Sequence, residues 1–171
     1  FIISANNRIP RIMKIIAAIS GSYGKDIYWG DRRFKSFPGA DELASADLEQ
    51  LKTCKGGFRC RYIHETANMV CSGRADLSLL YNTDLKTDDI RRILMQFPGV
   101  GNKVADCTIL YSGLRYDVFP TDVWVKRVME ELYFGREVTI GEIREFAAEY
   151  FGPYAGFAQQ YLFYYARENR I

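Results

Sequence analysis

The sequence predicts an all-α fold, and three observations support this prediction. Apolar residues recur at helical spacing along most of the 171 residues, alternating strand patterns are nearly absent, and glycine or proline separates the periodic segments. The composition, 48% hydrophobic and 26% charged, is that of a globular domain with a sizeable core. It excludes a disordered tail, a collagen-like repeat and a small disulfide scaffold, and no apolar run approaches the roughly 20 residues that span a membrane.

The expected helices follow one another with short interruptions. Thr87 is expected to cap a helix that begins with two acidic residues and has apolar residues, up to Phe97, on one face. Residues 25–40, with glycine and proline among charges, and residues 113–120 are expected to be loops. The other predicted helices cover residues 9–19, 41–46, 47–52, 59–71, 76–81, 102–111, 121–134, 139–151 and 153–170.

The overall charge of the chain is nearly balanced. Basic residues outnumber acidic ones by 23 to 21, and a net charge of +2 does not by itself indicate a nucleic-acid partner. Local charge is more informative, because residues 52–61 hold four basic side chains and no acidic one, with Phe58 among them. A charge run is usually a solvated face, and this alternative stays open. A second basic cluster consists of Arg32, Arg33 and Lys35.

The cysteine pattern argues against a metal centre. The cysteines lack CxxC spacing and, even with the single histidine His64, do not form a convincing zinc or iron–sulfur site. His64 is expected to lie on a helix surface or to pack against other side chains.

The start of the chain and its cysteines bear on its cellular location. The chain begins at Phe1 without a signal-peptide pattern. We therefore expect a non-secreted part of a longer protein, in a prokaryotic cytoplasm and nucleoid or a eukaryotic nucleus. Reduced thiols are expected at Cys54, Cys60, Cys71 and Cys107.

Residues 97–101, Phe-Pro-Gly-Val-Gly, join two predicted helices. Glycine permits positive φ and close approach of another backbone, while Pro98 restricts φ at the turn. The amides of Gly99, Gly101 and the next helical turn are expected to point outward at the positive end of the helix, which suits an anion such as phosphate. A simple tight turn between helices remains the alternative at this point.

Lys103 and Asp122 both stand at predicted helix N-termini. The positive end of a helix dipole disfavours the charged ammonium of Lys103 and stabilises the carboxylate of Asp122. This combination suits a nucleophilic amine and a group that stabilises a developing cation, with Cys107 on the face of Lys103. A surface lysine and an ordinary N-cap aspartate are the alternatives, and each alone is commoner than catalysis.

The segments LMQFPGVGNKVADC and VFPTDVWVKRV resemble the helix-hairpin-helix (Gly/Pro-Asp) DNA glycosylases, and within them the 8-oxoguanine DNA glycosylases. The segments FIISANNRIPRI, GGFRCRYI and FGPYAGFAQQYLF agree, so the resemblance spans essentially all 171 residues. It implies a helical glycosylase core at 1–171, with the helix-hairpin-helix at about 86–111. It also implies that the antiparallel β domain preceding this core in the family lies outside the chain. The four-cysteine iron–sulfur cluster of other branches has no counterpart in this spacing.

The resemblance implies a role for each matching residue. Lys103 attacks the sugar C1′ of a flipped nucleotide, and Asp122 stabilises the positive charge on the sugar. The lesion base is contacted by Gln159, Phe163, Cys107 and Pro120. The rest of the DNA is contacted by Asn6, Arg11, Phe58, Arg59, Gly99, Gly101, Val104 and Trp124. A structural monovalent or calcium cation, with no part in catalysis, is held by the main-chain carbonyls of Met95, Phe97 and Val100.

The implied function is that of a monomeric DNA glycosylase and AP lyase, which excises 8-oxoguanine opposite cytosine from duplex DNA through a lysine Schiff base and needs no catalytic cofactor. Phe58 replaces the tyrosine usual at the wedge position but keeps a stacking ring, and Trp124 stands where many relatives have a phosphate-contacting histidine. Two alternatives remain open. One is a glycosylase for alkylated or other damaged bases, and the other is a non-catalytic helix-hairpin-helix module that only grips DNA.

Overall fold

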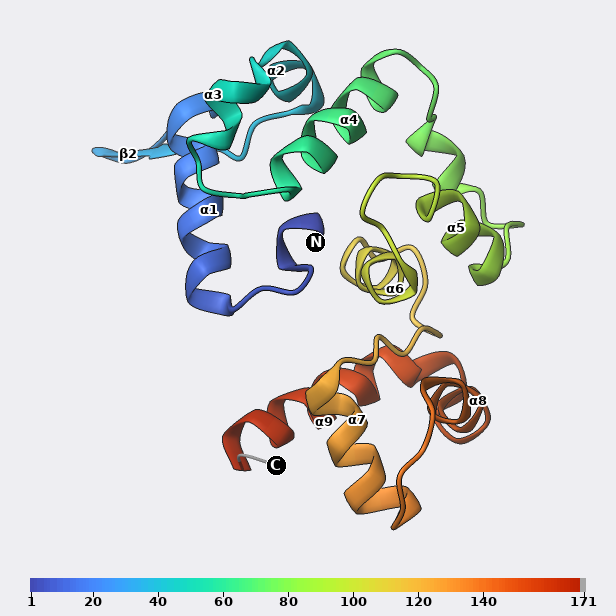
Figure 1. The fold of residues 1–171 in the computed structure, drawn as a ribbon. Coiled ribbons are helices and arrows are strands. Elements are labelled where there is room, and N and C mark those ends of the chain that lie inside the picture. The colour runs from blue at the N-terminus through green and yellow to red at the C-terminus, as the bar shows by residue number, and fades with distance from the viewer. Residues whose placement is uncertain (170–171) are drawn as a thin grey trace. The chain divides into compact units, whose positions relative to one another are not determined.

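The computed structural model describes residues 1–169, which are mainly helical (Figure 1). These residues form two compact units, and the chain passes from one to the other more than once. Unit 1 contains residues 1–82 and 95–100, and unit 2 contains residues 83–94 and the chain from Gly101 onward. The all-α fold class is confirmed, with one two-stranded sheet as an addition. Of the described helices, none is both long and apolar enough to cross a membrane.

Unit 1 is built around the amphipathic helices α1 and α4. Their apolar faces enclose a core in which Ile15, Ile19, Leu51 and Cys60 are almost fully buried. The short helix α2 packs along α4, as Figure 1 shows. The helical elements are η1 (Ile2–Ser4), α1 (Ile9–Tyr23), α2 (Ala40–Ser45), α3 (Leu48–Lys52), α4 (Arg59–Cys71) and η2 (Leu77–Tyr81).

The loop predicted for residues 25–40 is in part a β-hairpin, so that prediction is wrong. Strands β1 (Asp26–Trp29) and β2 (Arg32–Lys35) pair antiparallel, with Trp29 opposite Arg32. Gly30 takes φ +55° at the first of the two loop positions, where tight hairpins require glycine. The alternating pattern is missing because the side chains of both strands are exposed, and Asp26 forms ion pairs with two basic residues of β2.

Unit 2 has a core between α7, α8 and α9. Val125, Met129, Ile143 and Ala147 are fully buried there. The α6 helix is apolar on most sides and buries six consecutive or near-consecutive residues. The elements are α5 (Thr87–Leu94), α6 (Asn102–Tyr111), α7 (Val123–Met129), the π-helical turn η3 (Glu130–Phe134), α8 (Ile140–Tyr150), η4 (Gly152–Tyr154) and α9 (Ala155–Asn169).

Several helix ends differ from the predictions. Thr87 does not cap α5, because it is the first helical residue and its hydroxyl donates to the Asp117 carboxylate at 2.7 Å. The helix predicted for 121–134 begins at Val123 and changes to a π-helical turn before Gly135, which ends it at φ +64°. The predicted helix 153–170 begins with a 3₁₀ turn, and its last residue lies outside the described part of the chain.

Candidate active site

The turn between α5 and α6 needs glycine for two reasons. Gly99 has φ +77°, a conformation that favours glycine, and a Cβ at this position would lie 2.4 Å from the Tyr62 ring. The Val100 amide donates to the Phe97 carbonyl at 3.1 Å and closes the turn. The five residues therefore adopt the tight turn that the glycine and proline pattern predicts. The packing of this turn against Tyr62 of α4 is an additional finding of the structure.

Gly101 has a different role from Gly99. It is the N-cap of α6 with an extended backbone (φ −99°, ψ −176°) that any residue can adopt. A Cβ there would meet no heavy atom of the described chain within 4 Å, so open space lies in front of this helix end. Among the described side chains none caps α6. The first amides of α6 are thus left for an external acceptor, as expected of a phosphate site.

Lys103, Cys107 and Asp122 share one electrostatic environment beside this helix end. Burial raises the pKa of the Cys107 thiol, whereas Lys103 lowers that pKa through its charge and a side-chain hydrogen bond. The charges of Asp106 and Asp122 act on the same thiol and raise its pKa. Lys103 is half-buried and one helical turn before Cys107. The predicted nucleophile and the predicted carboxylate are therefore close enough to act on one buried group.

Asp122 also caps α7. One carboxylate oxygen, Oδ1, accepts from the amides of Trp124 and Val125, both at 3.0 Å. The N-cap alternative for Asp122 is therefore correct as a description of Oδ1, and the side chain is half-buried. The two amides fix the carboxylate in one orientation, because both hydrogen bonds converge on the same oxygen. Asp122 can therefore cap α7 and stabilise a positive charge at the same time. The cap uses the hydrogen bonds of Oδ1, and the stabilisation uses the negative charge of the carboxylate.

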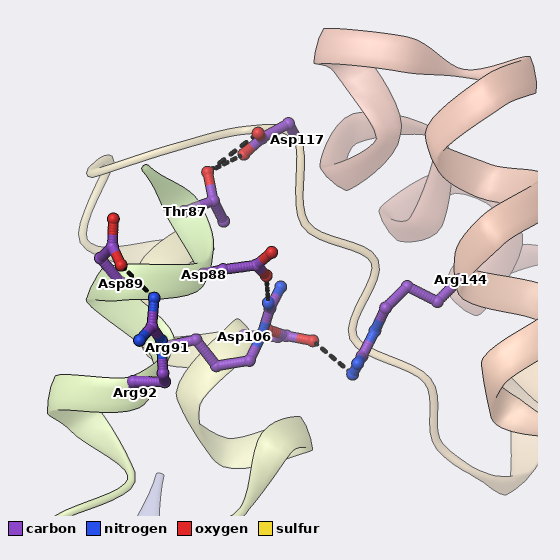
Figure 2. A network of polar contacts seen from close by, with 8 residues as sticks. All are labelled: Thr87, Asp88, Asp89, Arg91, Arg92, Asp106, Asp117 and Arg144. Atoms are coloured by element: carbon purple, nitrogen blue, oxygen red, sulfur yellow. Dashed lines mark hydrogen bonds and ion pairs between the residues drawn. The ribbon is translucent and has the colours of Figure 1, made fainter. Parts of the chain in front are cut away.

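A buried ion network holds α6 in place, and the sequence reasoning missed it. The Asp106 carboxylate is 1% exposed and accepts from Arg91 Nε of α5 at 2.5 Å. Arg144 of α8 lies 3.5 Å from its other oxygen. Figure 2 shows Asp106 between these two arginines, and Asp88 on the outer side of Arg91. A charged residue between buried neighbours, as in Val-Ala-Asp-Cys, is the sequence signal that could have indicated such a network.

The predicted base-contacting residues of α9 occupy two different environments. Gln159 is 5% exposed, and its Nε2 donates to the Pro120 carbonyl at 2.9 Å. Phe163 is half-buried against the core of unit 2, with the Arg167 guanidinium 5.6 Å from its ring centroid. Gln159 of α9 is therefore buried and bonded to Pro120. The Phe163 ring, one helical turn later, packs against the core of unit 2 but remains partly exposed.

The predicted DNA-contacting residues of unit 1 gather at the start of α4 and the turn before α1. Arg59 is 3% exposed and donates to the carbonyls of Ala5, Asn6 and Gly56. These bonds support Asn6 at a φ of +46°, which is uncommon for a residue other than glycine. Phe58 is exposed, and its ring stacks on the Arg59 guanidinium at 4.4 Å. Arg11 is exposed on α1.

Two further predicted DNA contacts lie near α6 and α7. The Val104 side chain is 7% exposed, so only its backbone amide, in the first turn of α6, remains for a phosphate. Trp124 is partly exposed in the first turn of α7, and Arg127 lies 5.7 Å from its ring centroid. An exposed indole beside a guanidinium can contact DNA, as predicted for this position. The indole is a different group from the phosphate-contacting histidine that many relatives have there.

Most of the chain matches one known family. Residues 1–153 match the family described as HhH-GPD superfamily base excision DNA repair protein. The chain belongs to this superfamily. The matched residues include α5, the Gly99 turn, α6 and Asp122.

Three individual proteins are similar to this chain over almost its entire length. A probable N-glycosylase/DNA lyase of Methanothermobacter thermautotrophicus is 32% identical over 99% of the chain. A solved 8-oxoguanine glycosylase/lyase of Clostridium acetobutylicum, bound to double-stranded DNA with cytosine opposite 8-oxoguanine, is 42% identical over 99% of the chain with a TM-score of 0.91. Another structure, MBOgg1 with a low-affinity DNA ligand, is 49% identical over the entire chain with a TM-score of 0.94. The chain spans 60% of the archaeal relative and 58% of each solved chain.

Proposed function

We propose that the chain is the catalytic core of a bifunctional DNA glycosylase and AP lyase that excises 8-oxoguanine from duplex DNA. The observation that carries this proposal is that the charges of Lys103 and Asp122 both act on the Cys107 thiol of α6, a helix whose N-terminus no described side chain caps. A module that only grips phosphate needs the amides of the hairpin but neither of these two charged side chains. The names of the similar proteins, N-glycosylase/DNA lyase and 8-oxoguanine glycosylase/lyase, support the same function.

The proposed chemistry assigns one role to each group. Lys103 Nζ attacks the sugar C1′ of a flipped nucleotide, and the bond between C1′ and the base breaks, so that the base leaves with the bonding electron pair. The Asp122 carboxylate stabilises the positive charge that develops on the sugar. Opening of the sugar ring gives a Schiff base on Lys103. Loss of a proton from C2′ then allows elimination of the 3′ phosphate and cleavage of the strand.

The lesion pocket in this proposal lies between α6 and α9 of unit 2. The buried Gln159 amide bonds the Watson–Crick edge of the base, and the Phe163 ring stacks on one face. Cys107 covers the opposite face, and the Pro120 carbonyl lies beside the Gln159 amide. Cys107 is 6% exposed and is a thiol, small enough to let a flat base approach.

DNA backbone and opposite-strand contacts complete the proposal. The amides at the N-terminus of α6 bind phosphate, and Trp124 contacts the backbone nearby. On unit 1, Asn6 and Arg11 contact the cytosine left without a partner, with Arg59 behind Asn6. The exposed Phe58 ring is the wedge that fills the gap in the helix. The protein acts as a monomer, in the cytoplasm and nucleoid of a prokaryote or the nucleus of a eukaryote.

The hairpin turn is the proposed site of a structural cation. Hard cations are coordinated by oxygen atoms, and main-chain carbonyls suit potassium or calcium. The candidate ligands are the carbonyls of Met95, Phe97 and Val100, which all belong to one short turn. The Phe97 carbonyl already accepts the Val100 amide, and its second lone pair remains for a cation. Such a cation would hold the turn in shape for phosphate and would take no part in bond breaking.

Borohydride trapping tests the proposed function. The chain is incubated with duplexes that carry 8-oxoguanine opposite each of the four bases, and the reduced protein–DNA adduct is quantified together with base release. We expect trapping and excision, strongest opposite cytosine. Binding without trapping would instead indicate a non-catalytic module. Trapping on an alkylated-base duplex but not on 8-oxoguanine would indicate the other glycosylase class.

A further inference from the structure

A chain of three hydrogen bonds leads from the end of α6 to the proposed lesion pocket. Tyr111, the last residue of α6, donates its hydroxyl to Gln160 Oε1 at 2.6 Å. Gln160 Nε2 donates to Gln159 Oε1 at 2.5 Å, and Gln159 Nε2 donates to the Pro120 carbonyl at 2.9 Å. All four residues belong to unit 2. Neither Gln160 nor Tyr111 has a role in the function proposed above.

The direction of these bonds is determined by the last acceptor. A proline carbonyl can only accept, so Gln159 must turn its amide nitrogen toward Pro120. Its oxygen then faces Gln160, which must donate, and the oxygen of Gln160 receives the hydroxyl hydrogen of Tyr111. Reversing the Gln159 amide would place two oxygen atoms against each other at a buried site. An unsatisfied buried polar atom is costly, so one orientation is strongly favoured.

The orientation of Gln159 matters for base recognition. With one N–H on Pro120 and one oxygen lone pair on Gln160, the amide keeps one N–H and one lone pair. A guanine-type base offers a donor at N1 next to an acceptor at O6. An adenine-type base offers the reverse order, an acceptor at N1 next to an amino donor. An amide held in one orientation therefore matches a base in a given position in one of these two patterns only.

We propose that Gln160 and Tyr111 are positioning residues that fix the amide orientation of Gln159 for a guanine-type edge. This inference rests on the proposed excision of 8-oxoguanine. Gln160 acts directly on Gln159, and Tyr111 acts on Gln160 from an exposed position, so its effect is smaller. Both act only on recognition of the base, because the chain of bonds does not include Lys103 or Asp122.

The first test compares two activities of the same variants. Single-turnover excision of 8-oxoguanine requires base recognition, whereas strand cleavage at a preformed abasic site has no base to recognise. We expect Gln160→Leu to lower excision about five- to tenfold, the effect of one lost hydrogen bond to a positioned group, and to leave abasic-site cleavage unchanged. Tyr111→Phe lowers excision about two- to threefold. The matched control is Tyr161→Phe, which removes a hydroxyl from the exposed face of α9 and changes neither activity.

A double-mutant cycle then tests whether Gln160 acts through Gln159. Lesion-duplex affinity is measured in a Lys103→Gln background for Gln159→Ala, Gln160→Leu and both together. The double variant is expected to match Gln159→Ala, because the orientation of a missing amide has no effect. Losses that multiply, or equal losses of excision and abasic-site cleavage in Gln160→Leu, would overturn the inference. Absence of 8-oxoguanine excision in the parent chain would instead overturn the proposed function, which separates the two failures.

Discussion

Arg91 and Asp106 form a buried ion pair that joins α5 to α6, with Arg91 Nε 2.5 Å from Asp106 Oδ1. Both side chains are buried, and burial raises the pKa of the Asp106 carboxyl while Arg91 opposes this. Arg144 of α8 approaches the second oxygen (Figure 2). The α6 helix, which this ion pair holds against α5, carries Lys103 and Cys107. The Arg91–Asp106 ion pair therefore fixes the position of the backbone from which the proposed nucleophile extends.

Loss of the Asp106 carboxylate is expected to destabilise unit 2. Asp106→Ala removes the buried partner of Arg91 and leaves only the exposed Asp88 to pair with it. Breaking a buried ion pair by removing one partner costs about 3–5 kcal/mol of unfolding free energy. The measurement is urea unfolding at neutral pH. The control is Asp88→Ala, which removes an Arg91 partner whose side chain is 80% exposed and should cost less than about 1 kcal/mol. Equal losses for the two variants would show that burial of the pair is unimportant.

Replacement of Lys103 is expected to separate binding from chemistry. Lys103→Gln keeps a polar side chain, one atom shorter than lysine, and removes the nucleophilic amine, so affinity for lesion DNA should persist while excision and the borohydride-trapped adduct are both lost. Gel-shift and trapping assays on one protein preparation measure the two properties. Lys126→Gln is a suitable control, because Lys126 of α7 forms an ion pair with Glu130, the first residue of η3. Normal excision by Lys103→Gln would remove this residue from the mechanism.

Two substitutions of Asp122 distinguish its cap from its charge. Asparagine is as good an N-cap as aspartate, so Asp122→Asn should keep the melting temperature and slow excision by at least about tenfold through loss of the charge. Asp122→Ala loses both and should in addition cost about 1 kcal/mol of stability. Thermal melts and single-turnover rates give the comparison. The assigned role fails if Asp122→Asn excises at the parental rate.

Arg11 and Arg59 are expected to differ in their effects. Both are predicted from the sequence to read the opposite cytosine, but Arg59 is buried and bonded to three carbonyls, whereas Arg11 is exposed. Arg11→Ala should therefore reduce excision most on cytosine-paired lesions and flatten the opposite-base preference, with little change in stability. Arg59→Ala should lower the unfolding free energy by about 2–3 kcal/mol, as hydrogen bonds to a charged group are lost.

Excision rates against all four opposite bases, together with urea unfolding, separate these effects. An equal loss of excision across the four bases in Arg11→Ala would mean that Arg11 contacts phosphate and reads no base.

The start of α8 should make stability depend on acid pH. The Thr139 amide and the Arg136 guanidinium hold the pKa of Glu142 at about 2, below its ordinary value of 4.5. Because the pKa is lower in the folded state, this stabilisation is complete above pH 4.5 and is lost as the pH falls toward 2. Unfolding measured between these pH values should show a shallower dependence for Glu142→Gln than for the parent. Identical slopes would show that the carboxylate adds no pH-dependent stability.

Local patterns in the sequence are sufficient to predict most helices and the hairpin turn. Helices 59–71 and 102–111 have the predicted bounds, because apolar spacing, glycine stops and capping positions lie within a few residues of one another. The β-hairpin at residues 26–35 is not predicted, since its strands are only four residues long and exposed on both faces, which leaves no alternation to detect.

The candidate site divides in the same way. Its residue types and their places at helix N-termini follow from local sequence, and the motif resemblance is sufficient to single out Lys103, Asp122 and Gln159. The partners of the buried polar side chains in and around the site could not be predicted, because the paired residues are far apart in the sequence. Arg91 and Asp106 are 15 residues apart, Gln159 and Pro120 are 39 apart, and Arg59 and Ala5 are 54 apart. Such pairs form only when packing of the apolar faces brings distant segments together, and a buried polar group then takes whichever partner that packing supplies.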